Sequence, residues 1–239
     1  DLPFGGVQLL MIGDLQQLAP VVTPQEEHLL GQHYDTPFFF SSNALKQVGY
    51  LTVELKKIYR QQDEQFISLL NQIRENKASE ETLQALNQRY IPNFVPPKDG
   101  NYIRLTTHNA PAQYINEQQL AALPSQSFSF TADIEGDFPE TSYPADFKLT
   151  LKSGAQVMFI KNDPQHRFYN GMIGEVIGVR TDEDGSKIIV RSKDSGEEFD
   201  LEKMEWNNAK YTLNEKTKEI EETVEGKFMQ YPLRLAWAI

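Results

Sequence analysis

The segment from Gly6 to Asp14 constrains the fold more than any other part of this 239-residue chain. Residues 9–12, Leu-Leu-Met-Ile, form a continuous apolar run of the kind found in strands that are buried on both faces of a parallel sheet. Gly13 and Asp14 end the run, so the first polar groups lie at the carboxyl end of the predicted strand, where open parallel sheets bind ligands. The pattern therefore predicts an α/β fold with a functional loop after residue 12.

Composition narrows the class of protein. With 239 residues and 39% hydrophobic content, the chain can bury a core and form one or two globular domains. It contains no apolar stretch of membrane-spanning length and no secretory signal, so we expect a cytoplasmic protein. The absence of cysteine excludes disulfides and thiolate metal sites, and the scatter of the four histidines leaves no zinc motif. A net charge of −11 argues against a protein that coats nucleic acid, although a groove needs only local donors and aromatic faces.

Three helices are predicted before residue 125. The first lies between residues 51 and 76, where apolar residues recur at helical spacing, and the second runs from Ser79, as N-cap, to Tyr90. The third contains Pro111 in its first turn and follows a short predicted strand at residues 102–107.

After Phe128 the apolar period changes to about two, which predicts an all-β module. Its strands are expected at residues 147–151, 156–160, 174–179, 188–190 and 198–201. Five or six short antiparallel strands favour a small SH3-like or OB-like barrel. Asn170-Gly171 predicts a type I′ hairpin turn, and the charged run at residues 215–225 a solvated hairpin.

Gly13, Asp14 and Gln17 provide the most informative chemistry. Gly13 has no side chain and lets a ligand approach the backbone, Asp14 provides a carboxylate and Gln17 an amide, all in one loop. Such groups suit a phosphate, its magnesium ion and an attacking water. The alternative is an ordinary turn after a strand, with Asp14 as a cap.

Residues 13–21, Gly-Asp-Leu-Gln-Gln-Leu-Ala-Pro-Val, resemble the third motif, Gly-Asp-x-x-Gln-Leu-x-Pro-Val, of the RecD-like branch of superfamily-one DNA helicases. Residues 3–10 resemble the same strand in the petite-integration-frequency (PIF) family of that branch. The resemblance implies that Gln17 senses the terminal phosphate of ATP and that Asp14 shapes the site.

Leu55-x-x-x-Tyr59-Arg60-Gln61 is the second motif. A guanidinium can stabilise charge on a transferring phosphoryl group, whereas most single arginines only form surface ion pairs. The motif resembles the fourth helicase motif, and this resemblance implies that Arg60 reaches ATP from a second motor domain.

Nucleic-acid contacts are expected at two places. The loop Thr106, Thr107, His108 and Asn109 resembles the family's loop that touches the backbone of single-stranded DNA, although Asn109 could instead cap the following helix. The region of Lys161 and Asn162 resembles the family's SH3-like insertion. Lys161, Asn162 and Arg167 could line a DNA path or simply be solvated.

The resemblance implies RecA-like motor domain segments with an inserted SH3-like β-barrel. Residues 1–42 would finish the first motor domain, residues 43–145 would form most of the second, and residues 146–228 the barrel. Residues 229–239 would return to the second motor domain and resemble the opening of the fifth helicase motif.

The sequence contains no Gly-x-x-x-x-Gly-Lys-Ser/Thr loop, no metal-binding Asp-Glu pair after a strand and no sixth-motif arginine. We therefore expect an internal fragment that does not hydrolyse ATP alone and binds neither ATP nor Mg²⁺, both of which the complete helicase would use. Its expected partners are single-stranded DNA and fork or duplex junctions, in repair, recombination or replication, with 5′-to-3′ translocation implied by the resemblance.

A non-enzymatic SH3-like module on an α/β scaffold, which binds a protein or peptide, is the rival hypothesis. It would account for the acidic surface. The order of the motifs favours the motor, because a binding module needs no Gly-Asp-x-x-Gln loop followed by Tyr-Arg-Gln.

Overall fold

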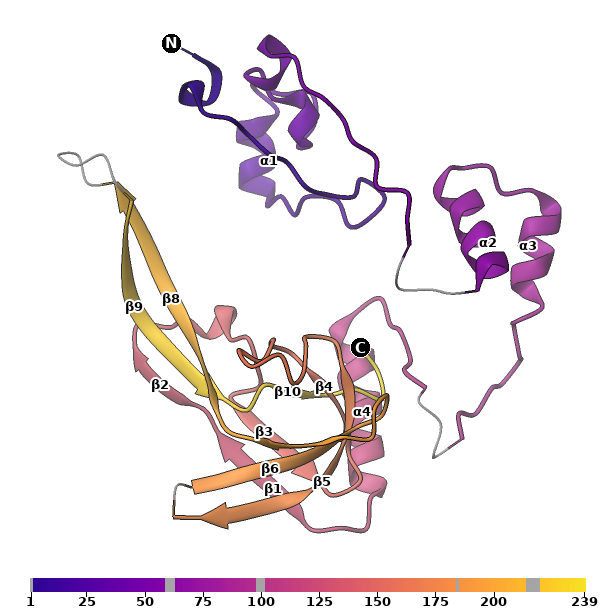
Figure 1. Cartoon of the computed structure of the whole chain (residues 1–239), viewed down its shortest axis with the longest axis vertical. Helices are drawn as coiled ribbons and strands as arrows, with labels where there is room; N and C mark the ends of the chain where they lie inside the picture. The colour runs from indigo at the N-terminus through magenta and orange to yellow at the C-terminus, as the bar shows by residue number, and fades with distance from the viewer. Residues whose placement is uncertain (1, 59–62, 98–101, 184, 214–219) are drawn as a thin grey trace. The chain divides into compact units, whose positions relative to one another are not determined.

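The computed structural model describes residues 2–58, 63–97, 102–183, 185–213 and 220–239. The chain divides into two compact units, Asp1–Phe94 and Val95–Ile239 (Figure 1). Within the described residues, the first unit contains helices without strands, whereas the second contains one α-helix and the strands β1 to β10. The chain is therefore mixed α/β, as the sequence predicts.

Each α-helix of the first unit begins after a side-chain cap, Thr23, Asp63 or Ser79, and the first of these helices was not predicted. They are α1 (Pro24–Leu30), α2 (Glu64–Arg74) and α3 (Glu80–Asn87). The Asp63 carboxylate accepts a hydrogen bond from the Phe66 N–H at 2.9 Å, which fixes the start of α2. Ser79 caps α3 in a reciprocal pair with Thr82, so the predicted Ser79 cap is confirmed.

Residues 9–12 do not form the predicted buried strand. They carry no strand assignment, and the side chains of Leu10 and Ile12 are 82% and 87% exposed. A strand needs hydrogen-bonded neighbours for its backbone groups, and no described backbone segment pairs with residues 9–12. An apolar run favours burial but does not supply the partner strand.

The second unit joins one helix to three antiparallel sheets. The helix is α4 (Asn109–Ala122). The strands are β1 (Ser127–Thr131), β2 (Asp133–Gly136), β3 (Lys148–Lys152), β4 (Gln156–Phe159), β5 (Ile173–Asp182), β6 (Gly185–Ser192), β7 (Glu198–Leu201), β8 (Met204–Leu213), β9 (Ile220–Gln230) and β10 (Leu233–Leu235). The largest sheet has the order β10-β4-β5-β6-β7, and the others are β1-β3 and β2-β9-β8. Figure 1 shows β8 and β9 as a long ribbon.

The five predicted β-runs are confirmed as β3 to β7. The turn at Asn170-Gly171 differs from the prediction, because only Gly171 has a positive φ, of 94°. The Met172 N–H donates to the Tyr169 carbonyl at 3.1 Å, so Gly171 is the third residue of this turn. A positive φ at that position alone is the pattern of a type II turn, and the predicted type I′ turn is wrong.

The main core lies between β3 and the large sheet. Its members share near-complete burial: Leu149, Leu151, Ala155, Val157, Phe159, Phe168, Met172, Val176, Ile188, Val190, Phe199, Leu201, Tyr231 and Leu233. Gly174 sits where two strands of this core approach closely. A Cβ atom there would lie 2.4 Å from the Val190 side chain, so only glycine fits this register.

The end of the chain pairs with a segment more than a hundred residues earlier. Residues 104–106 run parallel to residues 237–239, with Arg104 N–H to Trp237 carbonyl at 2.9 Å and Thr106 N–H to Ile239 carbonyl at 2.8 Å. The strand expected at residues 102–107 is thus reduced to one parallel bridge. The pairing nevertheless places the loop before α4 beside Ile239.

No helix in the described ranges has the length and apolar character that crossing a membrane requires.

Candidate nucleotide and nucleic-acid sites

Asp14 organises the loop that follows residues 9–12. Its carboxylate accepts hydrogen bonds from the Gln16 backbone N–H at 3.0 Å and from the Gln17 side-chain amide at 3.2 Å. The Asp14 carbonyl also accepts from the Gln17 backbone N–H at 3.2 Å. The carboxylate therefore orients the amide of Gln17, whose side chain is exposed to solvent.

Hydrogen bonds keep Asp14 ionised. The Gln16 N–H, then the Gln17 amide, and more weakly Arg74, lower the pKa of Asp14. The Arg74 guanidinium lies 3.7 Å from the carboxylate. Sequence reasoning missed Arg74. Its position in the last turn of a predicted helix favours a cation but does not identify the carboxylate that it approaches.

Arg60, with its neighbours Tyr59 and Gln61, lies outside the described residues. Its approach to ATP stays a prediction.

The loop before α4 holds its polar side chains in local hydrogen bonds. The Thr106 hydroxyl donates to the His108 carbonyl at 2.8 Å, and the Thr107 hydroxyl lies 2.9 Å from His108 Nδ1. These contacts order an exposed loop that can still present hydroxyl and imidazole groups to a phosphate.

His108, and not Asn109, is the N-cap residue of α4, and no side chain caps this helix. Asn109 is the first residue within the helix, so the alternative that Asn109 acts as the cap is wrong. The uncapped N–H groups at this end carry partial positive charge.

Lys161 packs inward instead of extending into solvent. Its ammonium lies 4.5 Å from the centre of the Trp206 ring and donates to the Glu205 carbonyl. Burial lowers the pKa of Lys161, and the charge of Glu205 partly offsets that effect. Asn162 has a structural bond as well, because its side-chain oxygen accepts the Asn170 N–H at 2.8 Å.

Arg167 forms a two-pronged ion pair with Asp163. Its Nε donates to Oδ2 at 2.8 Å and its Nη2 to Oδ1 at 2.9 Å. The Asp163 side chain is only 4% exposed. The Arg167 hydrogen bonds lower the pKa of Asp163 to about 2. Arg167 therefore holds the loop after β4 and is occupied by that contact.

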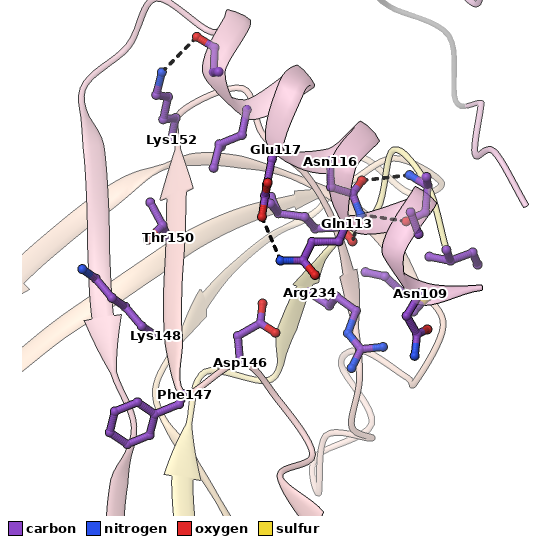
Figure 2. A pocket seen from close by; sticks show the side chains of 17 residues that line it. Asn109, Gln113, Asn116, Glu117, Asp146, Phe147, Lys148, Thr150, Lys152 and Arg234 are labelled. Carbon is purple, nitrogen blue, oxygen red and sulfur yellow. Dashed lines mark hydrogen bonds between the residues drawn. The ribbon is translucent and has the colours of Figure 1, made fainter. Parts of the chain in front are cut away.

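A cleft of about 830 Å³ runs along α4, between this helix and strands β3, β4 and β10. Figure 2 shows Asn109 and Gln113 on the helix, with Asp146 and Arg234 on the opposite side. Of the residues predicted to contact DNA, Asn109 lines this cleft, whereas Lys161 and Asn162 do not. Lys148 and Arg234 also line it, and sequence reasoning named neither: Lys148 belongs to no motif, and Arg234 lies in the segment that resembles the opening of the fifth helicase motif, to which no DNA contact was assigned.

Comparison with known proteins places these features in a family. No protein-family model matches the chain. It is 37% identical over 194 residues to the ATP-dependent DNA helicase Pif1 of Psychrobacter sp. (strain PRwf-1), across 76% of this chain and 28% of that protein. The human ATP-dependent DNA helicase PIF1 is 35% identical over 182 residues, across 74% of this chain and 27% of that protein. The Bdellovibrio bacteriovorus Pif1 matches 99% of this chain and 49% of its own length at 30% identity.

Solved structures agree. The crystal structure of Bacteroides sp. Pif1 in complex with ADP-AlF4 superimposes with a TM-score of 0.82 at 38% identity, and the match covers all of this chain and 54% of that one. Bacteroides Pif1 bound to single-stranded DNA matches with a TM-score of 0.65. The chain spans between 27% and 54% of the length of these relatives. The chain is therefore a Pif1-family DNA helicase homologue that covers part of the length of its relatives.

Proposed function

We propose that this chain is part of an ATP-dependent DNA helicase, which couples ATP hydrolysis to translocation on single-stranded DNA and to duplex unwinding. The observation that carries the proposal is the match of the whole chain to Bacteroides Pif1 in complex with ADP-AlF4, with a TM-score of 0.82. The motif at residues 13–21 supports it independently, since its carboxylate and amide lie side by side.

The finer architecture is part of this proposal. Residues 1–42 would belong to a first RecA-like motor domain and residues 43–145 to a second, with an SH3-like barrel at residues 146–228 and a return at residues 229–239. The antiparallel order β4-β5-β6-β7 around one core supports the barrel. The exposed apolar residues 9–12 would be covered by strands from the part of the helicase that this chain does not include.

The nucleotide site would use Asp14 and Gln17 from one motor domain and Arg60 from the other. Asp14 fits a positioning role, because it is ionised and already holds the Gln17 amide at 3.2 Å. An amide oriented in this way can contact a terminal phosphate or its attacking water. Bound ATP and Mg²⁺ would supply the phosphoryl group and its charge neutralisation. Among the described residues there is no group of three or more histidine, aspartate or glutamate side chains that could hold a metal ion.

The DNA-binding face would include Thr106, Thr107, His108 and Asn109, with Lys161 and Asn162 from the β-rich part. The exposed Thr107 hydroxyl and His108 imidazole support the first group, whereas Thr106 is half-buried and its hydroxyl donates to the His108 carbonyl. The inward packing of Lys161 weakens the case for the second. Bacteroides Pif1 bound to single-stranded DNA, and a structure that describes unwinding at forked double-stranded DNA by two coordinating Pif1 helicases, support these substrates.

The test is DNA-stimulated ATP hydrolysis by the longer protein that contains this chain, run beside the 239-residue chain itself. We expect strong activity in the longer protein. None is expected in the chain alone, whose sequence contains no phosphate-binding loop pattern. Silence in both proteins would reject the motor and favour the peptide-binding module.

A further inference from the structure

The cleft along α4 contains two basic side chains without partners. Nearly every described lysine and arginine of the second unit is engaged, by a carboxylate, a carbonyl or amide oxygen, or an aromatic ring: Lys152, Lys161, Arg167, Arg180, Lys187, Arg191, Lys193, Lys203, Lys210 and Lys227. Among the described cations of this unit, only Arg104, Lys148 and Arg234 show no such contact, and the last two line the cleft. In a chain of charge −11, unneutralised cations on one surface favour an anionic ligand.

An exposed aromatic residue, Phe147, lines the margin of the same cleft (Figure 2). Phe147 is 47% exposed, and its ring lies 6.1 Å from that of Tyr143 at an angle of 21°. Its carbonyl accepts hydrogen bonds from Ala132 N–H at 2.8 Å and from the Gln230 side chain at 3.3 Å. The ring is therefore supported from behind by a stacked neighbour and an ordered backbone. Such a ring offers a stacking face to a flat, unpaired ligand such as a base.

The remaining polar groups of the cleft include a hydrogen-bond donor and two carboxylates. Asn109, at the uncapped end of α4, can donate to a phosphate oxygen. Asp146 and Glu117 carry negative charge, and Glu117 already accepts from Gln113 at 2.8 Å. These carboxylates would repel further phosphates. They can accept hydrogen bonds from the amino groups of bases. The combination fits one strand better than a duplex, since a duplex offers no free base face.

We propose that this cleft binds a short segment of single-stranded nucleic acid, with its phosphates at Arg234 and Lys148 and one base against Phe147. The proposal rests on the proposed helicase function and adds Lys148, Phe147 and Arg234 to the expected nucleic-acid contacts; of these, Arg234 lies in the segment that resembles the opening of the fifth helicase motif. Figure 2 shows the Arg234 side chain near Asn109, and both residues line the cleft, which therefore reaches the first residue of α4.

The test measures binding of a fluorescein-labelled oligo-dT to the 239-residue chain by fluorescence anisotropy over a range of salt concentrations. The variants are Arg234→Gln, Lys148→Gln and the double variant. The matched control is Lys210→Gln, which removes the same charge from an exposed lysine on β8, outside the cleft. Each lost phosphate contact should reduce the slope of log affinity against log salt by about 0.7. The control should leave that slope unchanged.

A second pair of variants tests stacking. Phe147→Leu should weaken oligo-dT binding about tenfold, and Phe147→Tyr should retain it, since only the second keeps the aromatic face. Urea unfolding of each variant separates lost binding from lost folding.

Equal slopes for the cleft variants and for Lys210→Gln, or no oligo-dT binding by the unmodified chain, would overturn the proposal. Preference for duplex over oligo-dT would also overturn it. In each of these cases DNA-stimulated hydrolysis by the longer protein would still support the helicase function, so the two failures are distinguishable.

Discussion

Asn116 and Ala238 lie 122 positions apart in the chain and exchange two hydrogen bonds. The Asn116 amide donates to the Ala238 carbonyl at 2.8 Å, and the Ala238 N–H donates to the Asn116 side-chain oxygen at 2.9 Å. The side chain thus takes the place of a neighbouring strand. Gln156 holds the same segment from β4, because its amide donates to the Ala236 carbonyl at 2.8 Å. Two amides therefore fix residues 235–239 beside the loop that precedes α4.

We predict that Asn116→Ala destabilises the second unit by about 2 to 4 kcal/mol, because it leaves the N–H and carbonyl of Ala238 without their partner in a buried position. Urea unfolding measures the loss, and hydrogen exchange of the Ala238 amide should become faster. Gln113→Ala is the control. Gln113 is exposed on the same helix, and within the described residues its side chain hydrogen-bonds to Glu117 alone. Equal stability of the two variants would contradict the role assigned to Asn116.

Asp163 should make the stability depend on pH in acid. Its folded pKa of about 2 lies below the ordinary value of 3.8, so its contribution is present above about pH 3.8 and is lost as the pH falls toward 2. Asp163→Asn should lower stability near neutral pH and flatten this part of the acid dependence. Urea midpoints of both proteins across the acid range provide the measurement. Parallel curves would show that the Arg167 pair does not contribute.

Gln17→Ala in the complete helicase should reduce DNA-stimulated ATP hydrolysis about tenfold or more, and Arg60→Ala should do the same, because phosphoryl transfer depends on positioned polar groups. Gln16→Ala is a close control. Gln16 contacts Asp14 through its backbone N–H, which alanine retains, whereas Gln17 contacts it through its side chain. Near-normal turnover of both Gln17→Ala and Arg60→Ala would reject the roles assigned to these residues.

We predict that replacing His108 by serine raises the stability of the second unit and weakens DNA binding. No side chain caps α4, so His108→Ser should stabilise the second unit by about 0.5 kcal/mol through a cap to the Ala110 N–H, since Pro111 at the third position has no N–H to donate. The same change removes the imidazole next to Thr107 and should weaken oligo-dT binding by the helicase. His108→Ala separates the two effects, since it removes the ring without adding a cap. Unchanged binding by both variants would mean that the imidazole does not contact DNA.

The sequence by itself determined those features that depend on neighbours within a few positions. The Ser79 cap, the start of α2 after Asp63 and the alternating strands β3 to β7 follow from spacings of two to four residues, and the structure contains them. The motif at residues 13–21 also determines a local contact: Asp14 and Gln17 are three positions apart, and their side chains hydrogen-bond directly. Homology to Pif1 helicases agrees with the family that this motif indicates.

Tertiary structure decided which distant groups meet. A local pattern specifies that a residue is polar or apolar, but partner choice depends on the path of the whole chain. Residues 9–12 have a buried-strand composition and are exposed, because no described segment pairs with them. Arg74 approaches Asp14 and Asn116 binds Ala238, through contacts that no short spacing encodes. Lys148 and Arg234, 86 positions apart, line one cleft. The local sequence pattern indicates which residues favour burial. The partners of hydrogen bonds and of charges are decided only when the chain folds and brings distant residues together.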